Sequence, residues 1–165
     1  MDEPTDGLDP NQKQQVRELI QNLARDKIVI ISTHLLEEVN AVCSHAIIID
    51  RGHIMTDGTP AQLRSQSRYC GAITLELDTG FNSMSVVQQV LSQLKYVKHT
   101  ELDRERLNTI TVFAELNSDS KQVRRQDIYP IVSAAIKANS WIINELHREQ
   151  GRLDDVFRRL TGSAQ

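Results

Sequence analysis

The residues best suited to chemistry are two adjacent carboxylates near the start of the chain, Asp2 and Glu3, and a histidine, His34. Pro4 follows the carboxylates at once, so the pair stands where a strand must end. His34 follows the apolar run Lys27–Ser32, which predicts a parallel strand covered on both faces. Because ligands gather outside the carboxyl ends of parallel strands, we expect His34 to lie near Glu3.

This combination of side chains suits phosphoryl chemistry. Asp2 would help to hold a hydrated Mg²⁺, and Glu3 would orient or deprotonate an attacking water. An imidazole N–H of His34 would donate to a transferring phosphoryl group. Each residue also has a simpler interpretation, because an Asp-Glu pair before proline is often a solvated turn and a histidine after a strand is often a loop residue.

Other polar residues have structural explanations that suffice. Asp9 precedes Pro10, and this pair predicts a helix N-cap with proline at the first helical position. Glu37 and Glu38 indicate the charged start of a helix, where the helix dipole favours negative charge. The Cys43-x-His45 motif has no second pair of ligands, so it does not predict a metal site.

The pattern of apolar residues changes near residues 65–71 and predicts two different halves. In the first half it predicts helices over about residues 10–25, Leu35–Val42 and 59–65, and a hairpin of Ala46–Asp50 with His53–Thr56. In the second half it predicts strands Ala72–Asp78, 96–101, Leu107–Leu116 and Trp141–Leu146, and helices Ser85–Leu94, Asp127–Ala138 and Leu153–Leu160. The last helix is expected to turn Phe157 inward, and 117–126 is expected to be a polar loop.

Composition fits a soluble globular protein rather than a nucleic-acid or membrane-spanning one. The chain has 165 residues, of which 39% are hydrophobic and 25% charged, and its net charge is −3. This charge predicts no large nucleic-acid footprint, and no apolar run reaches the roughly 18–20 residues that span a bilayer. The two cysteines predict reduced thiols.

The order of these features resembles the second half of an ATP-binding cassette (ABC) ATPase. DEPTDGLDP, an amphipathic helix, an apolar strand, STH and then LLEEV appear in order over about Met1–Leu63. The resemblance implies that Asp2 is the Walker B aspartate that assists Mg²⁺ and Glu3 the catalytic glutamate that polarises water. It also implies that Gly7-Leu8-Asp9 is the D-loop, which touches the opposing subunit, and that His34 is the switch histidine at the γ-phosphate.

The resemblance also implies a fold and a domain division. Residues 1–66 would be the C-terminal portion of an ABC nucleotide-binding domain, part of a P-loop-type parallel sheet. Residues 71–165 would be a small accessory or regulatory α+β domain, for which the βαββαβ-like order predicts a ferredoxin-like type. The closing LDDVFRRLTG is similar to the end of ABC-2 or multidrug exporter subunits, which carry such a domain.

What the resemblance implies for function concerns the intact protein. ATP hydrolysis would drive a transmembrane permease partner, with ATP and Mg²⁺ bound between two nucleotide-binding subunits in a homodimer. Such a protein would be cytoplasmic and peripheral, held at the inner face of the cell membrane by the permease. No nucleic-acid partner is expected.

The chain lacks the motifs of the binding side of such a site. It contains no Gly-Lys pair, as a phosphate-binding loop requires, and none of its seven glycines are adjacent, as the family's signature loop requires. We therefore expect the chain by itself to bind ATP weakly and to hydrolyse little of it. The alternative is a stand-alone interaction or dimerisation module without ATPase activity.

Overall fold

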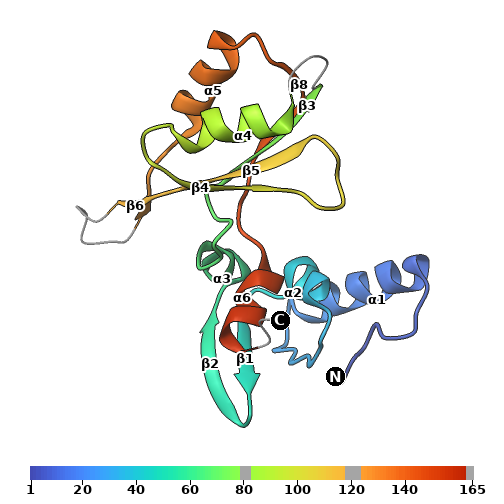
Figure 1. Cartoon of the computed structure of the whole chain (residues 1–165). Coiled ribbons are helices and arrows are strands. Elements are labelled where there is room, and N and C mark those ends of the chain that lie inside the picture. The colour runs from blue at the N-terminus through green and yellow to red at the C-terminus, as the bar shows by residue number, and fades with distance from the viewer. Residues whose placement is uncertain (79–82, 118–123, 163–165) are drawn as a thin grey trace. The chain divides into compact units, whose positions relative to one another are not determined.

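The computed structural model describes residues 1–78, 83–117 and 124–162, and in these ranges the chain is mixed α/β with antiparallel sheets (Figure 1). It divides into two compact units. One contains Met1–Leu63 together with the chain from Phe157 onward, and the other contains Arg64–Val156. Within the described residues, no helix combines the length and the apolar character that crossing a membrane requires.

The first unit begins with two helices, α1 (Pro10–Leu23) and α2 (Leu36–Val42). Asp9 caps α1 as predicted: its carboxylate accepts a hydrogen bond from the Gln12 backbone N–H (2.9 Å), and the Gln12 side chain accepts one from the Asp9 N–H (3.3 Å). An ion pair joins the two helices, because Arg17 on α1 donates to the Glu38 carboxylate on α2 at 2.7 Å. This pair links the two helices, which lie on either side of the segment 24–35 in the chain.

Between these helices, Lys27–Ser32 does not form the predicted strand. Among the described residues, its only strand-type pairing is an isolated parallel bridge between Asp2 and Ser32. A strand needs a neighbour along its length, but the segment at Asp2 stops at Pro4, which has no backbone N–H to donate. Ile28 and Ile30 are consequently 95% and 79% exposed. The apolar run was correctly identified, but the strand prediction is wrong for this chain.

After α2 the first unit continues with a hairpin and with a short helix that begins in this unit and ends just beyond it. Strands β1 (Ala46–Asp50) and β2 (His53–Gly58) pair antiparallel, with a bulge between Ile48 and Ile49. Arg51 and Gly52 both have positive φ angles (49° and 78°), which is the backbone of a tight two-residue hairpin turn. Helix α3 (Pro60–Ser65) then begins after Thr59, whose hydroxyl accepts the Gln62 N–H at 3.2 Å.

The second unit is a four-stranded antiparallel sheet with two helices. Along the chain its elements are β3 (Ile73–Asp78), α4 (Met84–Ser92), β4 (Val97–Leu102), β5 (Thr109–Ala114), α5 (Tyr129–Ala138) and β8 (Ile142–Arg148). The strand order is β4-β5-β3-β8. β8 extends two residues beyond the predicted strand. β6 (Leu116–Asn117) spans the border between the predicted strand and the predicted loop, and it pairs with β7 (Arg124–Arg125), which lies inside that loop. The rest of that loop, 118–123, lies outside the described residues.

One face of this sheet forms the hydrophobic core under α4 and α5, which lie on the same side of it (Figure 1). Leu75 on β3 pairs with Ile110 on β5, and both are fully buried. The opposite face is polar, since Thr74 pairs with Thr111 and their hydroxyls lie 3.1 Å apart. The alternation predicted from the sequence therefore separates a core face from a polar face.

The final helix, α6 (Leu153–Leu160), has acidic residues in its first turn and Arg158 and Arg159 in its last. Leu153 and Val156 are buried, but Phe157 is exposed, so the prediction that Phe157 faces inward is wrong. Leu153 and Val156 form the buried stripe of this short helix, and Phe157 lies outside that stripe.

Candidate functional site

The first unit brings Glu3 and His34 into direct contact. The backbone carbonyl of Ser32 accepts a hydrogen bond from the Glu3 backbone N–H at 2.9 Å. This hydrogen bond places Glu3 beside His34, which lies two residues after Ser32. Oε1 of Glu3 lies 2.9 Å from Nδ1 of His34 and accepts the His34 backbone N–H at 3.0 Å. Two side chains that are 31 positions apart thus form one carboxylate–imidazole pair.

The contact changes the acid–base properties of both groups. Its hydrogen bond to Glu3 raises the pKa of the His34 imidazole above the ordinary value, with the charge of Glu3 as a second cause. The same hydrogen bond lowers the pKa of the Glu3 carboxyl. The pair therefore favours an ionised carboxylate next to a readily protonated imidazole. Asp6 adds a smaller upward influence on the pKa of His34, which sequence reasoning did not find.

Glu3 holds this position with an uncommon backbone conformation. Its φ angle is 43°, in the left-handed region that non-glycine residues seldom adopt. Such conformations persist only where surrounding contacts enforce them, and they cluster at functional sites. Here the hydrogen bonds to Ser32 and His34 supply those contacts.

Asp2 lies beside this pair with an exposed carboxylate. The Ser32 hydroxyl donates to its Oδ1. Mg²⁺ is usually held by one or two carboxylates together with waters and substrate phosphates, so a single exposed aspartate fits an indirect role. Within residues 1–78, 83–117 and 124–162, no group of three or more histidine, cysteine or acidic side chains forms a metal cage.

Asp9 is occupied as the cap of α1 and makes no contact that distinguishes a second role. Gly7, two residues earlier, has a φ angle of 69°, which lets the turn between Glu3 and the helix close. The structure of this chain therefore accounts for Asp9 by capping alone.

Sequence reasoning missed the ion pair between Arg17 on α1 and Glu38 on α2. Nη2 and Nε of Arg17 donate to the two oxygens of Glu38 at 2.7 and 3.1 Å, and the Glu38 side chain is only 3% exposed. These hydrogen bonds are the main reason that the pKa of Glu38 is lowered. The sequence predicted only that Glu38 belongs to the charged start of a helix. The one local signal for Arg17 is that it lies three residues before the buried Ile20, which puts both on the same side of α1.

Comparison with known proteins gives relatives over nearly the whole chain, although no family model matches it. Over 163 residues, 98% of the chain, it is 31% identical to Nod factor export ATP-binding protein I of Burkholderia lata. The proteins of the same name from Rhizobium sp. (strain N33) and Rhizobium meliloti are 30% and 28% identical over the same length. The chain spans 46%, 46% and 42% of these three proteins, which is less than half of each.

Proposed function

We propose that the chain is the C-terminal part of an ABC transporter ATP-binding subunit, in which Asp2, Glu3 and His34 supply the hydrolytic side of an ATP site; its similarity to the ATP-binding proteins named above supports this. The observation that carries this proposal is the 2.9 Å contact between Glu3 and His34. In a random solvated turn, two residues so far apart in sequence have no reason to meet.

Each side chain has a task that its surroundings support. Glu3 orients an attacking water, because its lowered pKa keeps the carboxylate ionised and able to accept a hydrogen bond from that water. His34 holds Nδ1 toward Glu3, so its Nε2 is left to donate to the γ-phosphoryl group when the ring is protonated. The raised pKa of His34 increases the protonated fraction at neutral pH.

Asp2 would hold Mg²⁺ through a water molecule. The metal, when bound, neutralises the charge that develops on the phosphate oxygens. The hydroxyl of Ser32 orients the Asp2 carboxylate for this task by occupying Oδ1. Asp9, besides capping α1, would touch a second nucleotide-binding subunit across a homodimer.

In the intact protein, hydrolysis would energise transport through a transmembrane permease. The named relatives are export proteins, and the present chain would belong to the ABC-2 or multidrug exporter type. The protein would work on the cytoplasmic side, at the inner face of the membrane. This chain by itself would bind ATP and Mg²⁺ weakly and hydrolyse little ATP, because it contains no Gly-Lys pair for the phosphates.

The domain division and the finer fold are part of the same proposal. Residues 1–66 would be the last part of a P-loop-type parallel sheet, in which neighbouring strands cover the exposed Ile28 and Ile30. Residues 71–165 would form a ferredoxin-like accessory domain, supported by the βαββαβ order and by the central positions of β5 and β3 in the sheet.

The test of this proposal is Glu3→Gln in the ATP-binding subunit of which this chain would be the C-terminal part. We expect ATP to remain bound while phosphate release falls at least about 100-fold, since the amide cannot accept the proton of the water. Retained radiolabelled ATP and released phosphate measure the two quantities. Glu37→Gln is the matched control, because Glu37 is an exposed glutamate that pairs with Lys13 and Arg17 of α1. Near-normal turnover in Glu3→Gln would remove Glu3 from this role.

A further inference from the structure

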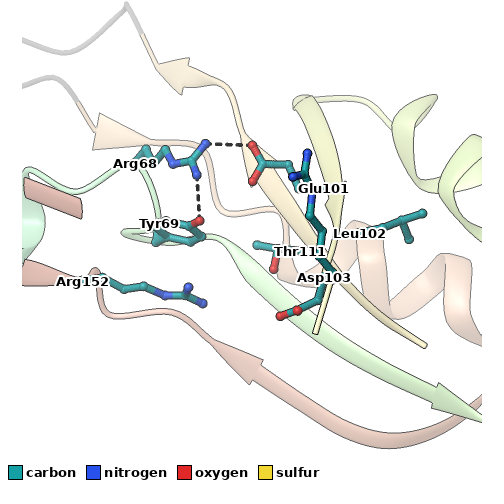
Figure 2. A pocket seen from close by; sticks show the side chains of 8 residues that line it. Arg68, Tyr69, Glu101, Leu102, Asp103, Thr111 and Arg152 are labelled. Atoms are coloured by element: carbon teal, nitrogen blue, oxygen red, sulfur yellow. Dashed lines mark hydrogen bonds and ion pairs between the residues drawn. The ribbon is translucent and has the colours of Figure 1, made fainter. Parts of the chain in front are cut away.

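The second unit contains a cavity of about 560 Å³ on the polar side of its sheet (Figure 2). This volume is within the usual range of small-molecule sites. Its lining comes from four parts of the unit: the segment before β3, the end of β4 with the turn after it, β5, and the segment before α6. The lining residues are Arg68, Tyr69, Glu101, Leu102, Asp103, Arg104, Thr111 and Arg152. The lining thus brings three guanidinium groups, one phenol ring and one hydroxyl to a single concave surface.

Two of the guanidinium groups are held rigidly against the same ring. The Arg152 guanidinium lies 3.9 Å from the centre of the Tyr69 ring, and that of Arg68 lies 4.8 Å from it. Figure 2 shows the Tyr69 ring between the two arginine side chains. The cation–π contact orients Arg152 without using its N–H groups. Arg68 also donates from Nη2 to the Tyr69 hydroxyl at 2.8 Å, and with Nη1 and Nε engaged as well it keeps one N–H on each terminal nitrogen. Both arginines therefore keep a fixed direction and spare donors.

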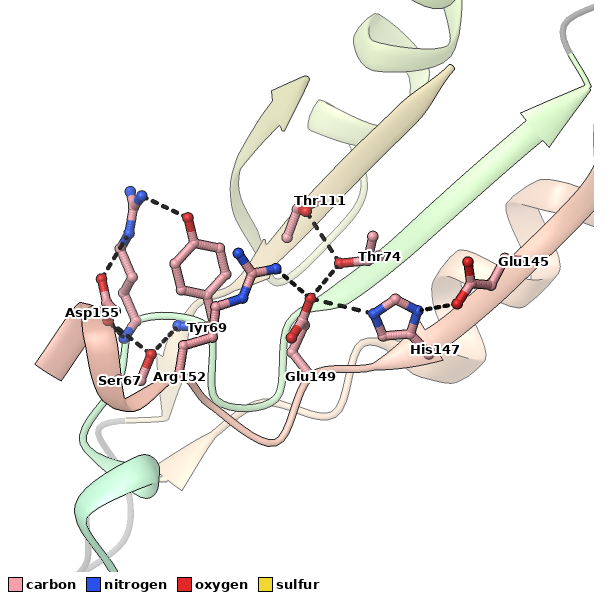
Figure 3. A network of polar contacts seen from close by, with 10 residues as sticks. Ser67, Tyr69, Thr74, Thr111, Glu145, His147, Glu149, Arg152 and Asp155 are labelled. Carbon is pink, nitrogen blue, oxygen red and sulfur yellow. Dashed lines mark hydrogen bonds and ion pairs between the residues drawn. The ribbon is translucent and has the colours of Figure 1, made fainter. Parts of the chain in front are cut away.

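A polar network behind the cavity fixes the same two arginines (Figure 3). Arg152 donates to Glu149 at 2.6 Å, and Glu149 in turn accepts the Thr74 hydroxyl at 2.8 Å. Nε of Arg68 lies 3.2 Å from Asp155, whose other oxygen accepts the Ser67 hydroxyl at 2.7 Å. Each arginine uses some of its five N–H donors on this network. Its side chain therefore loses little conformational entropy when a ligand binds.

The acidic groups in the lining are already engaged. Glu101 accepts from Nη1 of Arg68 at 2.8 Å. Asp103 accepts the backbone N–H groups of Glu105 and Arg106 at 2.9 and 3.0 Å, and these bonds lower its pKa. Arg104, in contrast, makes no hydrogen bond or ion pair with the part of the chain that the structure describes. The lining therefore carries three guanidinium groups against two carboxylates, a formal excess of one positive charge.

We propose that this cavity binds the phosphate group of a small molecule. A phosphate dianion has several acceptor oxygens and can be shared by more than one guanidinium, whereas a carboxylate is satisfied by a single bidentate arginine. The convergence of Arg68, Arg104 and Arg152 consequently favours phosphate. The site lies in the accessory unit and does not depend on the ATP site proposed above.

The test is an NMR titration of the whole 165-residue chain at constant ionic strength, with inorganic phosphate and with glucose 6-phosphate as probes. We expect saturable amide shifts at Tyr69, Asp103 and Arg152. Tighter binding of the ester would identify an organic phosphate as the ligand, and equal binding would identify inorganic phosphate. Absence of saturable shifts at the lining residues with both probes would overturn the proposal.

Variants with opposite expected effects sharpen this test. Arg104→Gln should weaken phosphate binding about tenfold, which is the effect of one charge-assisted hydrogen bond. Glu101→Gln should tighten it severalfold, because it removes a negative charge and releases a donor of Arg68. Arg106→Gln, in the same turn but outside the lining, is the matched control. Equal loss of binding in Arg104→Gln and Arg106→Gln would show nonspecific attraction to the turn and overturn the site.

Discussion

Glu3 and His34 owe their contact to a single parallel bridge between Asp2 and Ser32. The sequence predicted the approach of the two side chains because Pro4 ends a strand at Glu3 and an apolar run precedes His34. It did not predict the left-handed backbone of Glu3, since nothing in the residue type favours a φ angle of 43°. That conformation depends on hydrogen bonds from residues far along the chain, which no local pattern contains.

The titration of His34 tests this contact directly. Following the imidazole carbon-bound protons by NMR, we expect the pKa of His34 to lie above the ordinary histidine value and to fall in Glu3→Gln, because Glu3 is the main cause of the increase. Asp57→Asn is the control, since Asp57 pairs with His45 instead. A pKa of His34 that does not change in Glu3→Gln would contradict the hydrogen bond.

The same shifts define the pH range in which the pair stabilises the fold. The pKa of His34 is raised, so its contribution is fully present below the unfolded pKa of histidine and is lost as the pH rises through the folded value. The pKa of Glu3 is lowered, so its contribution is present above the unfolded pKa of glutamate and is lost as the pH falls through the folded value. Between the two unfolded values both contributions are present.

At the scale of elements, local signals predicted the helices well and the apolar run Lys27–Ser32 poorly. The cap at Asp9 is local and was predicted because its partner Gln12 is three residues away. A strand depends on neighbours instead, and the described chain offers Lys27–Ser32 one bridge only. The Arg17–Glu38 pair escaped prediction for the same reason, because it joins two different helices.

This ion pair is expected to hold α1 and α2 together. Arg17→Met leaves the Glu38 carboxylate buried without its cation, which is strongly destabilising. We predict that hydrogen exchange of the α1 and α2 amides becomes at least about tenfold faster, while exchange in β3 and β5 stays unchanged. Exchange measured by NMR resolves the two units separately.

Lys13→Met is the matched control for Arg17→Met. Lys13 also lies on α1 and pairs with a glutamate of α2, but its partner Glu37 is largely exposed. Exposed pairs contribute little, so exchange should change less than about threefold. Similar acceleration in both variants would show that helix contacts other than the buried pair control the opening.

At the scale of the molecule, the two units bury their apolar residues to different degrees. In Arg64–Val156 the strands alternate so that Leu75, Ile110 and Val112 are completely buried. In the first unit Ile28, Ile30 and Ile54 are largely exposed. The sequence predicted a change of organisation near residues 65–71, but it placed all of the last helix in the second half. Helical spacing identifies which face of α6 is apolar, but it does not say which part of the chain packs against that face.

This difference predicts unequal resistance to proteases. Trypsin should cleave first near Arg25 and Lys27, which are exposed and precede a segment with almost no ladder hydrogen bonds. Residues from about Gly71 to Val156 should persist longer, because opening the sheet exposes its whole core. Mass spectrometry of the digest at several times, at low protein concentration, measures the order of cleavage. If both halves resist equally, another molecular surface must cover the exposed isoleucines, and resistance that falls on dilution would identify that surface as a second copy of the chain.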